Sequence, residues 1–183
     1  MITRTEALNL LHEHGTSESL MRHALASEAV LAALAKRLGQ DTTLWSLTGL
    51  LHDLDYPQTE CAPENHGLVG ASILQEHLPE EALEAIRSHN GELNGHAPAH
   101  TLDYALRCGE TVTGLISAAA LMRPTRYEGM TVKSIKKKMK DKAFAASVNR
   151  ANIKECEQAG IGIDEFLELA IAAMAEQDHE NKN

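Results

Sequence analysis

Aromatic residues are scarce in this chain: Phe, Trp and Tyr make up 3% of its 183 residues, whereas 43% of the residues are hydrophobic. Stretches rich in Ala, Leu and Glu supply much of that sequence. This composition is typical of packed helices rather than of a β-sandwich. There is also no internal repeat and no convincing alternation of apolar and polar residues. We therefore expect an all-α fold.

Cysteine is sparse as well. Cys61, Cys108 and Cys156 are odd in number, widely spaced and without a C-x-x-C pair. This pattern excludes a disulfide framework and a thiolate zinc site, and it fits a reducing compartment. We expect these cysteines to fill the core.

Long hydrophobic runs are missing. The most apolar stretch, residues 114–122, is too short to cross a bilayer. Glu6, His12 and Glu13 interrupt the first twenty residues, where a secretory segment would need an unbroken apolar stretch. We therefore expect no membrane partner and a cytoplasmic protein. A G-x-S-x-G elbow and a P-loop are also absent, so the sequence does not support a serine hydrolase or a P-loop NTPase.

Basic residues are outnumbered: 17 Lys and Arg stand against 26 Asp and Glu, which gives a formal charge of −9. An acidic balance argues against a general nucleic-acid coat. The length suits one domain, which we place at residues 1–176, with a polar tail at 177–183 that we expect to be disordered. The oligomeric state is left open.

Apolar spacing and capping residues predict the helices. Gly39 suits a C-terminal cap, Asp41 an N-cap, and Pro57, Pro63, Pro79 and Pro124 mark helix boundaries. The predicted helices span residues 17–38, 41–56, 63–77, 79–90, 101–122, 132–140, 149–158 and 163–176, with a short segment near 143–148 and a loop at 92–100.

Ten histidines are unusual in such a chain. His52 and Asp53 are adjacent near the expected end of a helix, and the small residues Thr48 and Gly49 before them would leave room for an ion. Neighbouring helical side chains diverge by about 100°, so two of them share a metal only near a helix end or in a cleft.

His23, His66, His89 and Glu110 are predicted on the inner faces of four other helices. Taken singly, each could be a buried histidine bonded to a backbone carbonyl or, for Glu110, a half-exposed acid. Taken together they favour a shared cation, because burial without a partner costs about 1 to 3 kcal/mol per group.

This order of residues resembles the H…HD…H…H…D pattern of the HD-domain superfamily. The resemblance covers residues 5–175, because HGLVGASIL, LTGLLHDLDY, TGLISAAALMRP and VKSIKKKMKDKAFAASVNR look like segments of small bacterial HD-domain (HDIG-type) phosphohydrolases. It implies a helical bundle with a metal site between the central helices. One position departs from the pattern, because Glu110 stands where the family usually has Asp. Asp103, two turns earlier, is a fallback ligand.

The resemblance further implies that His23, His52, Asp53 and Glu110 hold a metal, that His66 and His89 add a second ion, and that Asp53 bridges the two. His52 and Asp53 would be catalytic. Imidazole and carboxylate ligands without thiolate suit Fe, Mn, Ni, Co or Zn, and Mg would be compatible with weak occupancy. One or two such divalent ions would lower the pKa of a bound water toward about 7 and so hydrolyse a nucleotide or another small phosphate ester.

The dense basic stretch after Pro124 is the candidate for phosphate binding. Lys133, Lys136 and Lys137, with Arg123 upstream, are the predicted phosphate ligands, whereas Lys138, Lys140 and Lys142 would keep the helix solvated. A purely solvated lysine face is the competing interpretation.

Three other functions stay open. Some HD-domain relatives hold two irons and activate dioxygen, which would make this protein a di-iron oxygenase. A metal or nucleotide sensor without turnover would explain Glu110 as a lost catalytic geometry. Nucleic-acid binding through the lysine run would be steeply salt-dependent.

Overall fold

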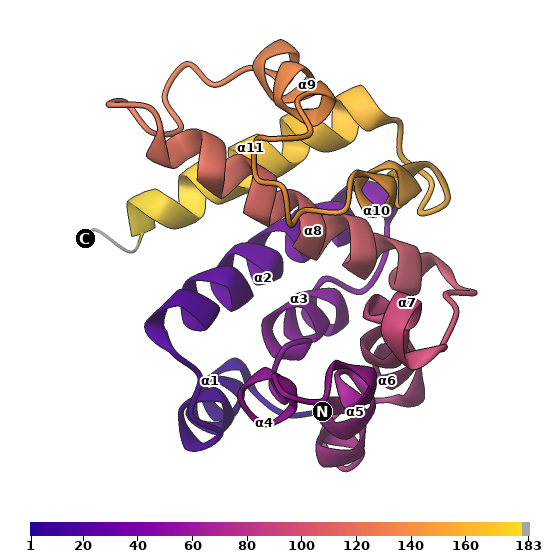
Figure 1. The fold of residues 1–183 in the computed structure, drawn as a ribbon. Coiled ribbons are helices and arrows are strands. Elements are labelled where there is room, and N and C mark those ends of the chain that lie inside the picture. The colour runs from indigo at the N-terminus through magenta and orange to yellow at the C-terminus, as the bar shows by residue number, and fades with distance from the viewer. Residues whose placement is uncertain (181–183) are drawn as a thin grey trace.

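Helices alone form the regular structure of residues 1–180, the part of the chain that the computed structural model describes. Figure 1 shows their arrangement. The helices are α1 (Arg4–Glu13), α2 (Glu18–Leu38), α3 (Thr42–Leu51), α4 (Tyr56–Thr59), η1 (Pro63–Asn65), α5 (Leu68–Leu74), α6 (Glu80–His89), α7 (Gly91–Asn94), α8 (Thr101–Leu121), α9 (Val132–Lys140), α10 (Arg150–Lys154), η2 (Glu155–Glu157) and α11 (Ile163–Glu180). The prediction of an all-α fold is confirmed.

The two 21-residue helices α2 and α8 form the centre of the bundle. α3 packs along α2, and α8 contacts α2, α6, α10 and α11 (Figure 1). Their facing sides bury Leu31 and Leu34 from α2, Leu50 from α3, and Leu106 and Leu115 from α8. Burial of these large apolar side chains contributes roughly 1.5 to 3 kcal/mol each. The C-terminal ends of α3 and α6 meet beside α2 and α8.

Several helix boundaries agree with the capping residues. Ser17 accepts a hydrogen bond from the Leu20 N–H, and Gly39 has the left-handed conformation with φ of 68°. Asp41 accepts a bond from the Leu44 N–H and so caps α3. Such caps satisfy the backbone groups that a helix end leaves unpaired.

The predicted helices 41–56 and 63–77 are each interrupted, so these two predictions were wrong in their boundaries. α3 ends at Leu51, and Pro57 lies in the first turn of α4, where its missing N–H costs nothing. The second prediction splits into η1 and α5 around His66 and Gly67. Gly67 has φ of 83°, and a Cβ there would lie 2.6 Å from the Ile86 carbonyl oxygen. Only glycine fits this turn.

Further differences concern short or terminal elements. α1 was not predicted, α7 lies where a loop was expected, residues 143–148 form turns, and α10 with η2 replaces the helix at 149–158. α11 continues to Glu180, so residues 177–180 are helical where disorder was expected, and residues 181–183 lie outside the described part. None of the described helices has the length and apolarity to cross a bilayer.

Two of the three cysteines are in the core as expected. Cys108 and Cys156 are buried, and burial raises the pKa of both thiols. Cys61 is exposed, so its assignment to the core was wrong. It follows α4 in a turn, where apolar spacing gives no information about burial.

Gly49 sets the distance between α2 and α3. A Cβ at this position would lie 2.8 Å from the Ser27 carbonyl oxygen and 3.0 Å from its carbonyl carbon, both in the α2 backbone. The small residue therefore permits close packing of two helices, and it is not there to leave room for an ion.

We predict that Gly49→Ala destabilises the protein by about 1 to 3 kcal/mol, because α3 must move away from α2. Gly162→Ala is the matched control, since no atom lies within 4 Å of a Cβ built there. Urea unfolding of both variants measures the effect. Equal stability of the two variants would contradict this account of the packing.

Candidate metal centre

Six side chains predicted as metal ligands come from five separate segments. His23 lies on α2, His52 follows the last residue of α3, and Asp53 lies in the next turn. His66 lies between η1 and α5, His89 ends α6, and Glu110 lies on α8. Because the ends of α3 and α6 meet beside α2 and α8, the fold brings all five segments to one place.

The Asp53 carboxylate stands at the centre of this cluster. Its Oδ1 lies 3.4 Å from Nε2 of His52, 3.2 Å from Nε2 of His66 and 3.4 Å from Nε2 of His89. Its Oδ2 lies 3.6 Å from Nε2 of His23. Two groups of ligand atoms lie within 4.8 Å of one another, His23, His52 and Asp53 in one and Asp53, His66 and His89 in the other. Asp53 belongs to both.

Backbone carbonyls fix two of the imidazoles. His52 Nδ1 lies 2.8 Å from the Gly49 oxygen, and His89 Nδ1 lies 2.6 Å from the Ile86 oxygen. A carbonyl oxygen only accepts hydrogen bonds, so both Nδ1 atoms must carry the proton. Each ring in its neutral form therefore presents an unprotonated Nε2 to the cluster.

Thr113 fixes the tautomer of His23. The Thr113 hydroxyl donates to the Glu110 backbone oxygen at 2.7 Å and lies 3.0 Å from His23 Nδ1. Since the hydroxyl has a single hydrogen, it accepts the bond from Nδ1–H. His23 thus also directs a lone pair on Nε2 toward Asp53.

Asp55 fixes the tautomer of His66. This carboxylate is fully buried, accepts from His66 Nδ1 at 2.8 Å and accepts from the N–H groups of Gly67 at 2.9 Å and Gly70 at 2.7 Å. Asp55 thereby caps α5 from another segment and orients a ring of the cluster. The geometry thus assigns Asp55 the role of orienting His66.

The inward nitrogens face one another with too few protons. His23 Nε2 lies 3.2 Å from His52 Nε2, and His66 Nε2 lies 3.0 Å from His89 Nε2. With every Nδ1 protonated, two lone pairs approach at hydrogen-bond distance, which is unfavourable unless a proton or cation lies between them. Imidazole and carboxylate donors in this arrangement fit a divalent transition metal.

The pKa shifts in the metal-free cluster determine which of its groups carry a charge. Burial acts to raise the pKa of Asp53, but His52 and the hydrogen bonds of His66 and His89 outweigh it and hold that pKa well below its usual range. For His66, burial lowers the pKa, yet Asp53 and Asp55 together raise it to about 9. Burial lowers the pKa of His52 to about 3, despite Asp53. A charged pair of Asp53 and His66 therefore sits beside neutral imidazoles.

Glu110 stands apart from the two ligand groups. Its Oε2 lies 3.9 Å from His23 Nε2, and its Oε1 accepts a hydrogen bond from the Thr111 hydroxyl. Burial raises the pKa of Glu110 to about 8, with a further contribution from Asp53. The fallback ligand Asp103 is not in the cluster, because its Oδ2 accepts from the Ala99 and His100 N–H groups and caps α8.

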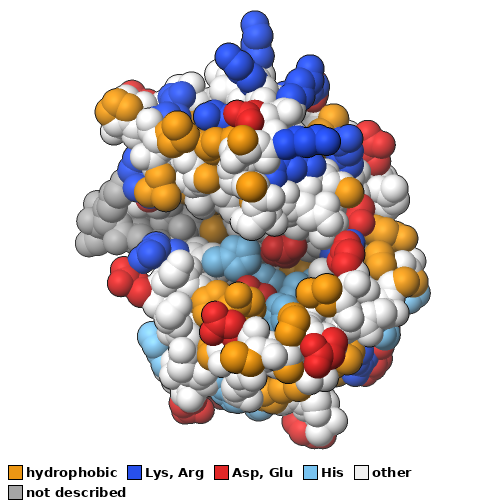
Figure 2. All heavy atoms as spheres, in the orientation of Figure 1, with side chains coloured by type: hydrophobic (Ala, Val, Ile, Leu, Met, Phe, Trp, Pro, Cys, Tyr) orange, Lys and Arg blue, Asp and Glu red, His pale blue; other side chains and the backbone are white. Residues whose placement is uncertain are grey.

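A cavity of about 490 Å³ opens onto the cluster. Figure 2 shows histidine side chains at the bottom of a hollow on this face. Asparagine, serine and apolar side chains complete the wall, and no Lys or Arg among the described residues lines it. Besides the cluster, the lining consists of Tyr56, Asn90, Glu92, Leu93, Thr111, Gly114, Ser147, Val148, Asn149 and Asn152. The sequence analysis did not predict these residues, because they carry no motif.

Arg107 lies behind this wall with its donors occupied. It is buried and donates to the Ser88 oxygen at 2.9 Å and the His89 oxygen at 3.2 Å. It also forms ion pairs with Glu92 and with Glu155. Arg107 therefore holds the end of α6 that carries His89.

The predicted phosphate ligands do not lie at the histidine cavity. Arg123 donates to the backbone oxygens of Arg126 at 2.9 Å and Glu128 at 2.6 Å and so braces a turn. Lys133, Lys136 and Lys137 border a separate hollow on α9, where Lys136 pairs with Asp164 at 2.6 Å. The structure thus brings the ligand candidates together but not the basic ones.

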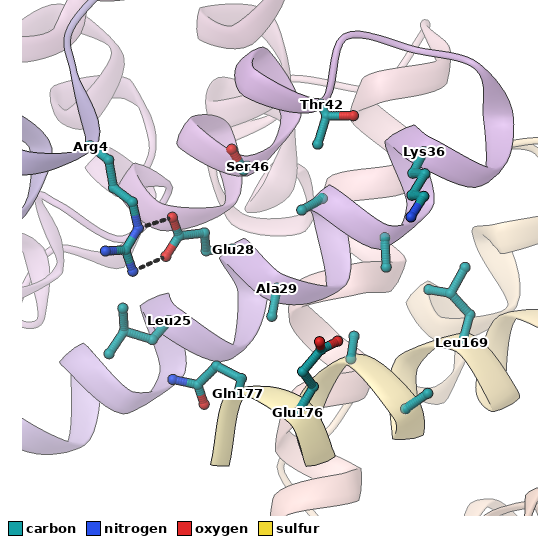
Figure 3. A pocket seen from close by; sticks show the side chains of 14 residues that line it. Arg4, Leu25, Glu28, Ala29, Lys36, Thr42, Ser46, Leu169, Glu176 and Gln177 are labelled. Atoms are coloured by element: carbon teal, nitrogen blue, oxygen red, sulfur yellow. Dashed lines mark hydrogen bonds and ion pairs between the residues drawn. The ribbon is translucent and has the colours of Figure 1, made fainter. Parts of the chain in front are cut away.

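Another groove, of about 660 Å³, lies between α2 and α11 (Figure 3). Alanine is the commonest residue in its walls, and one of its acids, Glu28, is paired with Arg4 at 2.6 Å. It holds no histidine or cysteine, so the chemistry of the molecule points to the histidine cavity.

The family model for the HD domain matches residues 20–142, about two thirds of the chain. All six ligand candidates lie inside the matched range. The chain belongs to the HD-domain family. A divalent metal centre is what this family membership implies, and the His and Asp groups of this HD domain could hold one.

A curated relative was also found. A tRNA (cytidine(56)-2'-O)-methyltransferase of Thermoplasma volcanium is 31% identical to this HD-domain chain over 85 residues, which are 46% of this chain and 25% of that protein. The chain thus matches about a quarter of the length of this relative. No solved structure matches the chain.

Proton NMR of the metal-free protein should show His66 losing its proton near pH 9, with His52 neutral down to about pH 3. Because the pKa of His66 in the folded protein lies above the usual histidine value of 6.5, its stabilising contribution is complete below pH 6.5 and is lost as the pH rises through about 9. Asp55→Asn should lower the pKa of His66, since it removes a charge in direct contact.

Asp41→Asn serves as the control, because Asp41 caps α3 and contacts no histidine of the cluster. An unchanged His66 titration in Asp55→Asn would show that Asp55 does not act on this ring.

Proposed function

We propose that this HD-domain protein is a metal-dependent phosphohydrolase that hydrolyses a nucleotide or another small phosphate ester. The observation that carries the proposal is the convergence of four imidazole Nε2 atoms on the Asp53 carboxylate, with each Nδ1 bound to another group. Family membership supports a hydrolytic reaction at such a site.

The ligand assignment follows the two groups around Asp53. His23, His52 and Asp53 would hold one ion, and His66 and His89 would bring in a second beside the shared carboxylate. Glu110 completes the first site only if its carboxylate turns from Thr111 toward His23. A bound divalent ion supplies Lewis acidity, which activates water and neutralises charge on a phosphoryl oxygen.

The residues of the chain would bind and position the ester. Asp53, ionised at neutral pH, stands at the base of the cavity and orients the groups around it. Asn90, Ser147, Asn149 and Asn152 offer neutral donors and acceptors to the organic part of the substrate, and Leu93 offers an apolar contact. Because no described Lys or Arg lines the wall, the charge of the phosphate must be balanced at the bottom of the cavity.

The activity named for the relative supports one class of substrate. That protein acts on tRNA, which favours nucleotides and nucleic acids among the candidate esters. Methyl transfer is not carried over, because the matched 85 residues are 25% of that protein.

His52→Ala and Asp53→Ala should each abolish stoichiometric metal binding and lower turnover by more than about 100-fold. The measurement is a metal-supplemented screen of nucleoside phosphates, cyclic nucleotides and sugar phosphates, with elemental analysis of each protein. His12→Ala, an exposed histidine on α1, is the control and should retain both properties. Oxygen consumption without phosphate release would replace the hydrolase with a di-iron oxygenase.

Glu110→Asp tests whether the position outside the ligand groups marks a sensor. We expect the native protein to turn over substrate already, and the shorter acid to retain metal while changing kcat within about tenfold. Activity that appears only in Glu110→Asp, with none in the native protein, would overturn the hydrolase proposal in favour of a binding protein.

A further inference from the structure

The charges of this protein are separated along the chain. Residues 123–154, here named the basic segment, contain ten of the 17 Lys and Arg but two of the 26 Asp and Glu. The segment thus carries a formal charge of +8, and the remaining residues carry −17. The total of −9 conceals a strongly basic region, so net charge alone does not decide which partners the protein binds.

Helix α9 directs part of this charge outward. Ile135 is buried and Met139 is half-buried against the core, which leaves the opposite side of the helix in solvent. Lys133, Lys137 and Lys140 are exposed on that side at spacings of four and three residues, and we name them the lysine face. They border a hollow of about 800 Å³.

The lysine face has no ion pair within the described residues, whereas Lys136 on the same helix pairs with Asp164. Like charges at these spacings destabilise a helix. Asp164 borders the same hollow but pairs with Lys136, and no described acidic residue forms an ion pair with these three lysines. An arrangement that costs stability and leaves cations unpaired fits a surface that meets an external polyanion.

The same segment forms a wall of the histidine cavity. Its residues Ser147, Val148, Asn149 and Asn152 line the cavity, and Figure 2 shows Lys and Arg side chains gathered above the hollow that holds the histidines. Seven positions separate Lys140 from Ser147, so the two surfaces lie at most about 25 Å apart.

Arg150 makes this link rigid. Its Nη1 donates to the Ala145 and Val148 backbone oxygens at 2.6 Å each, and its Nη2 donates to the Phe144 oxygen. Residues 144–148 are thereby held between the lysine face and the cavity wall. The two surfaces keep a fixed relation, as a shared ligand would require.

We propose that the basic segment and the histidine cavity bind one single-stranded nucleic acid, with a terminal phosphate in the cavity and backbone phosphates along the lysine face. The inference rests on the proposed phosphohydrolase function, because a polymer of phosphate esters satisfies both surfaces at once. A cavity of about 490 Å³ has room for a terminal nucleotide rather than for a duplex end, so we expect single strands to bind more tightly than a duplex. The basic residues thus act on substrate affinity, away from the reacting atoms.

The test is fluorescence anisotropy with the full chain and short single-stranded RNA, single-stranded DNA and duplex DNA of about 12 nucleotides. Lys137→Glu/Lys140→Glu should weaken single-strand binding by about tenfold or more and reduce the slope of log affinity against log salt by about 1.4. Lys36→Glu/Arg37→Glu, on α2, makes the same change in charge and should alter binding less than twofold.

Binding along the lysine face is measured without added metal, so this result does not depend on a phosphate in the cavity and stands even if no ester is hydrolysed and the proposed function fails. With turnover, the lysine variant should raise KM for the oligonucleotide about tenfold while leaving a small phosphodiester unaffected. Equal weakening by both double variants, equal binding of duplex, or binding of an acidic peptide in place of nucleic acid would each overturn the inference.

Discussion

The candidate metal centre depends on one half-buried carboxylate held among four imidazoles. Asp53 lies 3.2 to 3.6 Å from the inward nitrogens of His23, His52, His66 and His89. Removing such groups from water is unfavourable unless each finds a partner. The fold supplies a partner for every outward nitrogen and leaves the inward ones facing each other, so the cluster is complete only with positive charge inside it.

The outer partners explain why these helices end where they do. Gly49 and Ile86 carbonyl oxygens, which lie in the last turns of α3 and α6, accept from His52 and His89. Helix ends have free carbonyls, so a histidine there is oriented without disturbing the helix. Asp55 acts at the break between η1 and α5, since it caps α5 and orients His66 at the same time. The same backbone and side-chain groups at these helix ends therefore also orient the histidine rings.

The sequence predicted the all-α class, because periodic apolar residues and caps act locally. It also indicated all six candidate metal ligands, through the order of the His, Asp and Glu residues. Prediction from the sequence failed where a contact with a residue distant in the chain determines the local backbone structure. Nothing local shows that α3 stops at Leu51 or that Gly67 turns beneath Ile86. α1 was predictable in retrospect, since Thr3 and Glu6 form a capping box that can be recognised from sequence. The cavity wall was not, because neutral residues such as Asn149 and Asn152 gain meaning only from their position.

Charge separation links the wall to the rest of the molecule. The ionised Asp53 at the bottom of the cavity would repel an anion, no described Lys or Arg lines the wall to offset it, and Arg107 beside the cavity is occupied by Glu92 and Glu155. Metal ions bound at the base of the cavity would offset that repulsion close to the phosphate. The basic segment at the rim would offset it from further away. Dissolved salt screens the attraction between the exposed basic segment and an anion, so this attraction is weak at high salt. The attraction at the enclosed base of the cavity is screened far less. If both proposals hold, the basic segment would supply affinity and the histidine cavity the chemistry, in separate parts of one surface.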